Sequence, residues 1–148
     1  MLRKLLILLP VLAMIPILSM AAEEDKYRLN PTPDPNAPFG FYIPKDLNDA
    51  LSELQKMLHP DLVEEITHGS ESDMIKYHFG LGMWIRNNWA LWKGSRISRY
   101  FNELETYHPD DMSGIILDSF WTQLNGKPIG LEAQIGKYKT YWEKEKQQ

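Results

Sequence analysis

The most informative part of the chain is the segment Tyr77–Trp92, YHFGLGMWIRNNWALW. Three tryptophans, Trp84, Trp89 and Trp92, lie within nine consecutive residues of this segment. A helix that is apolar on nearly every side is usually buried on nearly every side, so the stretch predicts a buried helix. Gly80 and Gly82 each lower helix stability by up to about 1 kcal/mol. They predict either a break before Met83 or the close approach of another backbone.

Three polar residues stand together inside this apolar stretch: Arg86, Asn87 and Asn88. Neighbouring positions of a helix point about 100° apart, so the three side chains cannot share one exposed face. At least one of them is expected to be buried, and a buried polar group needs partners. For the Arg86 guanidinium the partner should be a carboxylate, and the best candidates are Asp110 and Asp111.

The segment His108-Pro109-Asp110-Asp111 has two interpretations. Proline at the first helical position followed by two acids is ordinary helix-start chemistry, because the acids neutralise free amides and the helix dipole. In the functional interpretation, one aspartate also pairs with Arg86, and His78 and His108 line the same cleft. Both interpretations stay open on the sequence alone.

From Asp46 onward, apolar residues recur at three- and four-residue steps, which is the helical pattern. Asp46 is a predicted N-cap, and Pro60 and Pro109 suit the first position of a helix. The pattern predicts helices over 46–58, 60–67, from Ser70 or Ser72 to Trp92, 96–104, 109–124, and from about Leu131 to Trp142. No stretch alternates convincingly every two residues, so we expect an all-α fold, a compact single domain of five or six helices.

The N-terminal residues 1–21 have the build of a secretory signal peptide, with cleavage expected after Ala21. Arg3 and Lys4 precede an apolar run, Leu5–Leu18, and Ser19-Met20-Ala21 after it supplies the small residues of a cleavage site. The alternative is an uncleaved membrane anchor, but the run of 14 residues is shorter than the roughly 20 that span a bilayer. The protein is therefore expected to be periplasmic or secreted, without a stable membrane span after cleavage.

Residues 22–45 contain five prolines, which predicts an extended, Pro-rich linker before a helical domain at 46–146. Within the linker, Phe39–Ile43 is too apolar to stay in water, so we expect this short patch to dock on the folded body.

Composition excludes several classes of function. The chain has 148 residues and no cysteine, which excludes disulfides, Cys-ligated zinc, thiol catalysis and a lipid-modified bacterial N-terminus. Its net charge is −4, and the chain without residues 1–21 has 14 basic and 20 acidic residues, or −6. This balance argues against nucleic acid as the partner.

The function that these observations favour is binding, in a cleft between the helix of Arg86 and the start of the helix at Pro109. Tryptophan and arginine are common interface anchors, although tryptophans at helical spacing are more often core. The expected partner is a protein or small ligand of the cell envelope, and a specific form of the hypothesis is an inhibitor or immunity protein for an exported toxin. The candidate binding residues are His78, Trp84, Arg86, Asn87, Asn88, Trp89, His108, Asp110 and Asp111.

The same residues allow two chemical alternatives. The first is a metal site of His78, His108, Asp110 and Asp111, which have suitable ligand atoms but no HExxH or similar short spacing, so no metal and no cofactor are expected. The second is a hydrolase of cell-wall or glycan material that uses His108 with Asp110 or Asp111. No GxSxG or other nucleophile signature supports the second alternative.

Two longer motifs carry a family resemblance. The first is HxGxGMWIRNNWxLW at residues 78–92, and the second is HPDDMSxIIL at residues 108–117. With these motifs the chain resembles a family of small bacterial domains of unknown function, over about Pro44 to Trp142. The resemblance implies no activity, substrate or catalytic residue. It implies only that the two segments belong to one recurring design.

Overall fold

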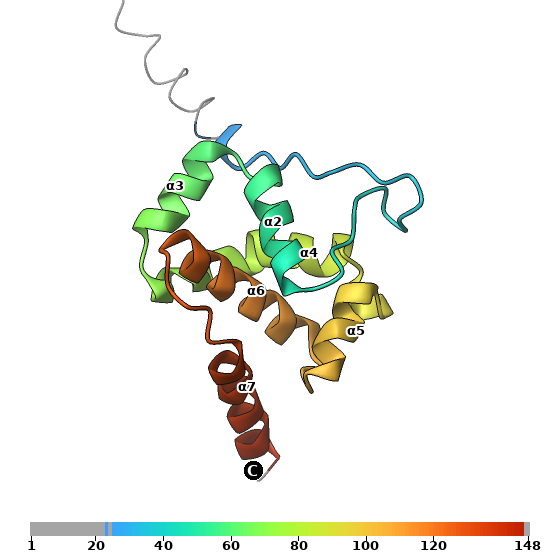
Figure 1. Cartoon of the computed structure of the whole chain (residues 1–148), viewed down its shortest axis with the longest axis vertical. Coiled ribbons are helices and arrows are strands. Elements are labelled where there is room, and N and C mark those ends of the chain that lie inside the picture. Colours follow the sequence, from blue (N-terminus) through green and yellow to red (C-terminus); the bar gives the residue numbers. More distant parts are fainter. Residues whose placement is uncertain (1–22, 24, 147–148) are drawn as a thin grey trace, which may run out of the picture.

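The computed structural model describes residues 23 and 25–146, and these form an all-α domain, as the sequence predicts (Figure 1). The predicted signal peptide at residues 1–21 lies outside the described residues. The α-helices are α2 (Leu47–Met57), α3 (Pro60–His68), α4 (Met83–Asn88), α5 (Arg96–Glu103), α6 (Pro109–Leu124) and α7 (Leu131–Glu145). Between them lie the 3₁₀-helix η2 (Glu71–Tyr77), the π-helix η3 (His78–Gly82) and the short 3₁₀-helix η4 (Leu91–Lys93).

Helix α6 occupies the centre of the domain and contacts each of the other α-helices. Its sequence explains this position, because buried residues occur around nearly its whole circumference rather than along one stripe. Ile115, Ile116 and Phe120 are fully buried, and even its serines at 113 and 119 are enclosed. The remaining helices each bury one face against α6 or against each other.

The stretch Tyr77–Trp92 is not one buried helix, and that part of the prediction is wrong. It runs from the end of η2 through η3 and α4 and reaches η4, and Phe79, Met83 and Trp92 are exposed. The glycines do not break the helical backbone before Met83: Gly82 and Met83 are both in the right-handed helical conformation, and the π-helix η3 passes directly into α4. Each change of helix type rotates the following residues, so the apolar side chains point in several directions instead of into one core.

The other expectation for the glycines, close approach of neighbouring groups, is met at Gly82. A Cβ atom built there would lie 3.2 Å from Nη1 of Arg86 and 3.4 Å from Cδ1 of Leu117. The missing side chain therefore lets the guanidinium of Arg86 and the flank of α6 come close to the backbone.

The predicted helix starts are confirmed by their capping bonds. The Asp46 carboxylate accepts a hydrogen bond from the amide of Asp49, and the Ser95 hydroxyl accepts one from Ser98. Pro60 and Pro109 occupy first helical positions, after His59 and His108, whose ring nitrogens accept the amides two residues ahead. Backbone amides that the helices leave free are thus satisfied by side chains.

Part of the Pro-rich segment is bonded to α2. Thr32 donates from its amide and its hydroxyl to the two carboxylate oxygens of Glu53, at 2.8 and 2.9 Å. These bonds satisfy the charge of Glu53, which is buried. The expected docking of the 39–43 patch is observed: Ile43 packs against the core, and the Phe41 ring lies 5.8 Å from that of Trp84. Phe39 stays at the surface.

Helix α7 packs along the start of α6 and projects from the rest of the domain (Figure 1). A Cβ atom on Gly114 would lie 2.3 Å from the hydroxyl of Tyr138, so the absence of a side chain at 114 allows the two helices to meet. No helix within residues 25–146 combines the length and the apolar composition that crossing a bilayer requires.

Candidate functional site

The Arg86 guanidinium is buried between α4 and α6, and its side chain is only 7% exposed. Its Nε lies 2.9 Å from Oδ1 of Asp110, so the predicted pairing with a carboxylate is present. The two terminal nitrogens donate to the hydroxyl of Ser113 at 2.8 Å and to the carbonyl of His78 at 3.3 Å. All three nitrogens of this charge are satisfied, which is the condition for burying an arginine.

Three basic side chains lie within 4 Å of the Asp110 carboxylate. Besides Arg86, the ring of His78 approaches its Oδ1 to 3.9 Å, and the ring of His108 approaches its Oδ2 to 3.6 Å. The amide of Asp110 also donates to Nδ1 of His108 at 3.2 Å, as the cap of α6. The helix-start role and the pairing with Arg86 are therefore compatible, because one acid serves both. The expectation that His78 and His108 line the same cleft is wrong, because the two rings line separate hollows on either side of Asp110. We call Arg86, Asp110, His78 and His108 the Arg86 cluster.

Asp111 faces away from Arg86 toward α7. Its Oδ2 accepts a hydrogen bond of 2.7 Å from the indole nitrogen of Trp142, and the residue is only 8% exposed. Burial raises the pKa of the Asp111 carboxyl above its usual range. Sequence reasoning missed Trp142, because nothing in its spacing from Asp111 announces a contact between the ends of α6 and α7.

His108 contacts both Asp110 of the Arg86 cluster and Trp142 of α7. Its ring meets the ring of Trp92 edge-on at 5.8 Å and the ring of Trp142 at 5.5 Å. The imidazole is thus held between two indoles while Nδ1 caps α6. Geometries of this kind fix the orientation of an aromatic ring.

The other four predicted site residues lie outside the cluster. Asn87 is exposed, and the side-chain amide of Asn88 donates to the backbone carbonyl of Trp84 one turn earlier. Trp84 is half-buried, and Trp89 is fully buried in the core, where its indole nitrogen has no hydrogen-bond partner among the residues that the structure describes. Trp89 therefore contributes to packing, which is the commoner fate of a tryptophan at helical spacing. Among the described residues, no group of three or more His, Asp or Glu side chains is arranged to hold a metal ion.

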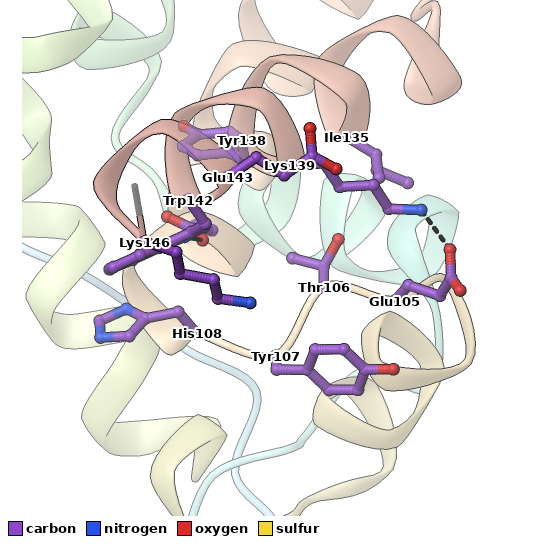
Figure 2. Close-up of a pocket in the computed structure, with 11 residues that line it drawn as sticks. Glu105, Thr106, Tyr107, His108, Ile135, Tyr138, Lys139, Trp142, Glu143 and Lys146 are labelled. Atoms are coloured by element: carbon purple, nitrogen blue, oxygen red, sulfur yellow. Dashed lines mark hydrogen bonds and ion pairs between the residues drawn. The ribbon is translucent and has the colours of Figure 1, made fainter. Parts of the chain in front are cut away.

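A pocket of about 670 Å³ opens next to the cluster, between residues 105–108 and α7 (Figure 2). Lys139 and Glu105 pair at one side of the pocket, joining its two walls. Glu105 has a left-handed backbone with φ of 60°, which is a mildly strained conformation for a non-glycine residue. The lining residues are Glu105, Thr106, Tyr107, His108, Asp111, Ile135, Tyr138, Lys139, Trp142, Glu143 and Lys146.

Asp118 is a second perturbed acid, farther along α6. Burial, and then repulsion from Glu71, raise the pKa of this carboxyl from 3.8 to about 6. A raised pKa means that the folded state holds the proton more tightly than the unfolded state. Ionised Asp118 therefore costs stability, and this cost is absent below about pH 4 and complete above about pH 6.

Asp118→Asn is consequently expected to stabilise the domain by about 1 to 2 kcal/mol at pH 7.5 and to have no effect at pH 4. Urea unfolding of the variant and the parent at the two pH values measures the difference. A variant less stable than the parent at pH 7.5 would show that ionised Asp118 is stabilising.

The family model of a domain of unknown function, DUF6794, matches residues 43–124. The chain belongs to the DUF6794 family. The resemblance to a family of small domains of unknown function is thus confirmed, and the match begins close to the expected Pro44 but ends at Leu124, before the expected Trp142. No curated protein and no solved structure matches the chain.

The DUF6794 match runs from just before α2 to the end of α6. The whole Arg86 cluster lies inside it, whereas α7 and the residues before 43 lie outside it. The pocket therefore has one wall in the matched region and one wall in the segment that follows.

Proposed function

We propose that this chain is an exported binding domain of the cell envelope and that its ligand occupies the pocket beside His108. The pocket is the observation that carries the proposal. Its volume of about 670 Å³ falls within the usual range of small-ligand sites, about 300–1,000 Å³.

The lining of the pocket has the composition of a binding site rather than of a packing defect. Tyr107, His108 and Trp142 offer aromatic surface, and both acidic and basic side chains surround it. Aromatic rings of this kind provide large contact area, while a few charged groups orient the bound molecule. The Arg86 cluster holds the start of α6, and with it His108, in a fixed position. Its role in this proposal is to position the wall of the pocket.

The test uses soluble glycan–peptide fragments of the cell wall as the probe. These fragments should raise the melting temperature of the parent protein, and the rise should be lost in Tyr107→Ser, which changes an exposed pocket residue. Tyr27→Ser, at an exposed tyrosine that does not line the pocket, is the matched control and should keep the response. A response that is absent in the parent, or equal in both variants, would contradict the proposed site.

Export is the second part of the proposal, and it rests on the sequence of residues 1–21. Expression of the full chain in a Gram-negative host should yield a periplasmic protein whose intact mass corresponds to a chain that begins at Ala22. Recovery of the uncleaved chain from the cytoplasm would contradict it.

Hydrolysis of envelope material is the alternative function, and one observation favours it. His108 and Asp111 line the same pocket, and burial raises the pKa of Asp111, as in many general acids. On this alternative, the parent protein cleaves the glycan–peptide fragments, and Asp111→Asn abolishes cleavage while the melting-temperature response persists. Binding without cleavage by the parent supports the binding function instead.

A further inference from the structure

A groove lies on the surface formed by η2, η3, α6 and α7, and Tyr138 separates it from the pocket at His108 by lining both. It consists of two adjoining hollows of about 220 and 470 Å³, which share Glu71, Ser72 and Asp118. The smaller hollow has both polar and apolar walls. Its other lining residues are Met74, Ile75, His78, Gly114, Leu117 and Tyr138.

The groove carries two carboxylates, Asp118 and Glu71, and Lys137 offsets only part of their negative charge. Within residues 25–146, no hydrogen bond or ion pair reaches the side-chain carboxylate of Asp118. The hydroxyl of Thr122 donates to the backbone carbonyl of Asp118 instead. Glu71 has a single distant partner, Lys137 at 3.7 Å, and both of these side chains are largely exposed. Lys137 favours the charged form of Asp118, but burial and Glu71 outweigh it and raise the pKa of Asp118. A cation in the groove would relieve both unfavourable effects.

Beside the groove, apolar side chains project into water. Ile75 is 70% exposed and Phe79 is 74% exposed, and they are four residues apart along η2 and η3. Ile75 itself lines the smaller hollow, and the Phe79 ring packs edge-on, at 5.2 Å, against His78, which lines it too. Neighbouring large apolar residues at a surface mark an interaction site.

We propose that this groove docks a segment of a partner protein that inserts a lysine or arginine side chain toward Asp118 and Glu71. Apolar residues next to that basic residue cover Ile75 and Phe79. The occupant follows from charge complementarity, because the groove is acidic and the chain without residues 1–21 carries −6. An apolar wall suits the methylene stem of a lysine or arginine, and the carboxylates suit its charged end. The proposal is independent of the pocket at His108.

The probe is a fluorescein-labelled amphipathic helical peptide of leucine and lysine, and its counterpart carries glutamate in place of lysine. Fluorescence anisotropy should show binding of the lysine peptide and no binding of the glutamate peptide. Asp118→Asn removes one charge and is expected to weaken the lysine peptide about tenfold, a loss typical of one charge-assisted contact. Phe79→Ser removes an exposed ring and should weaken it by a similar factor.

Two matched controls isolate the groove. Asp61→Asn removes an exposed carboxylate from α3, and Tyr27→Ser removes an exposed ring elsewhere, so both should bind the lysine peptide within twofold of the parent. Asp118→Asn is expected to be more stable than the parent, so its loss of binding would not reflect unfolding.

Several results would overturn the proposal. One is equal binding of the two peptides, and another is unchanged affinity for the lysine peptide in Asp118→Asn and Phe79→Ser. A third is a dimer of the parent in sedimentation that Phe79→Ser abolishes, because a second copy would then cover the face.

Discussion

Arg86→Met should lower the free energy of unfolding by about 3 kcal/mol, the largest effect expected from a single polar residue in this domain. Methionine keeps most of the side-chain volume but removes the ion pair to Asp110 and the bonds to Ser113 and the carbonyl of His78. Breaking a fully buried pair costs about 3 to 5 kcal/mol. The lower end applies because Asp110 is 41% exposed and water can reach its carboxylate.

Urea unfolding of the parent and of Arg86→Met measures this effect. Arg28→Met is the matched control, because Arg28 is exposed and its loss should change stability by less than about 0.5 kcal/mol. If Arg86→Met behaves like Arg28→Met, the guanidinium is not buried in an ion pair in solution.

Trp142→Phe should destabilise the domain by about 2 kcal/mol at neutral pH. Phenylalanine keeps a ring against His108 but removes the indole donor to Asp111. The buried carboxylate then has lost its hydrogen-bond partner, and an unsatisfied buried acceptor costs about 1 to 3 kcal/mol.

The pH dependence of this loss follows from the pKa of Asp111. The indole bond lowers that pKa and opposes the effect of burial, so its removal raises the pKa further. The loss is therefore largest where Asp111 is ionised and shrinks as the pH falls and the carboxyl gains a proton. Unfolding at pH 7.5 and pH 4 tests this, with Tyr141→Phe as the control at an exposed neighbour. An equal loss at both pH values would show that the ring, and not the hydrogen bond, is responsible.

The parts of the fold that local chemistry determines could be predicted from the sequence. Capping side chains and prolines place the starts of α2 and α6, because a helix start must satisfy free amides within a few residues. That Arg86 pairs with a carboxylate could also be predicted, since a charge among apolar residues requires an anion, and the two adjacent acids at the start of α6 were the best candidates. That argument did not separate Asp110 from Asp111, because adjacent helical residues differ in direction and the direction depends on packing.

The parts that tertiary packing determines could not be predicted. The change from 3₁₀ to π to α geometry between Glu71 and Asn88 depends on how η2 and η3 meet α6, and local propensity gives no measure of that. The hydrogen bond from Thr32 to Glu53 joins two segments. The sequence predicts a linker for the first and an amphipathic helix for the second, and neither pattern indicates that they meet. For the same reason, the pocket between residues 105–108 and α7 has no sequence signal.

The Arg86 cluster and the pocket differ in how they relate to the family match. The cluster belongs to the part of the chain that is matched to the DUF6794 family, and the pocket combines that part with α7. Loss of the cluster should therefore affect folding, whereas changes on α7 should affect the pocket and, at Trp142, the stability of the domain as well.

The Arg86–Asp110 pair joins α4 to the start of α6 and so holds His108 in place. A double-mutant cycle of Arg86→Met, Asp110→Ala and both together, followed by urea unfolding, measures the coupling energy of this pair. We expect a coupling of about 2 kcal/mol, because the second substitution removes little once the first has broken the pair. Additive losses, with a coupling near zero, would contradict it.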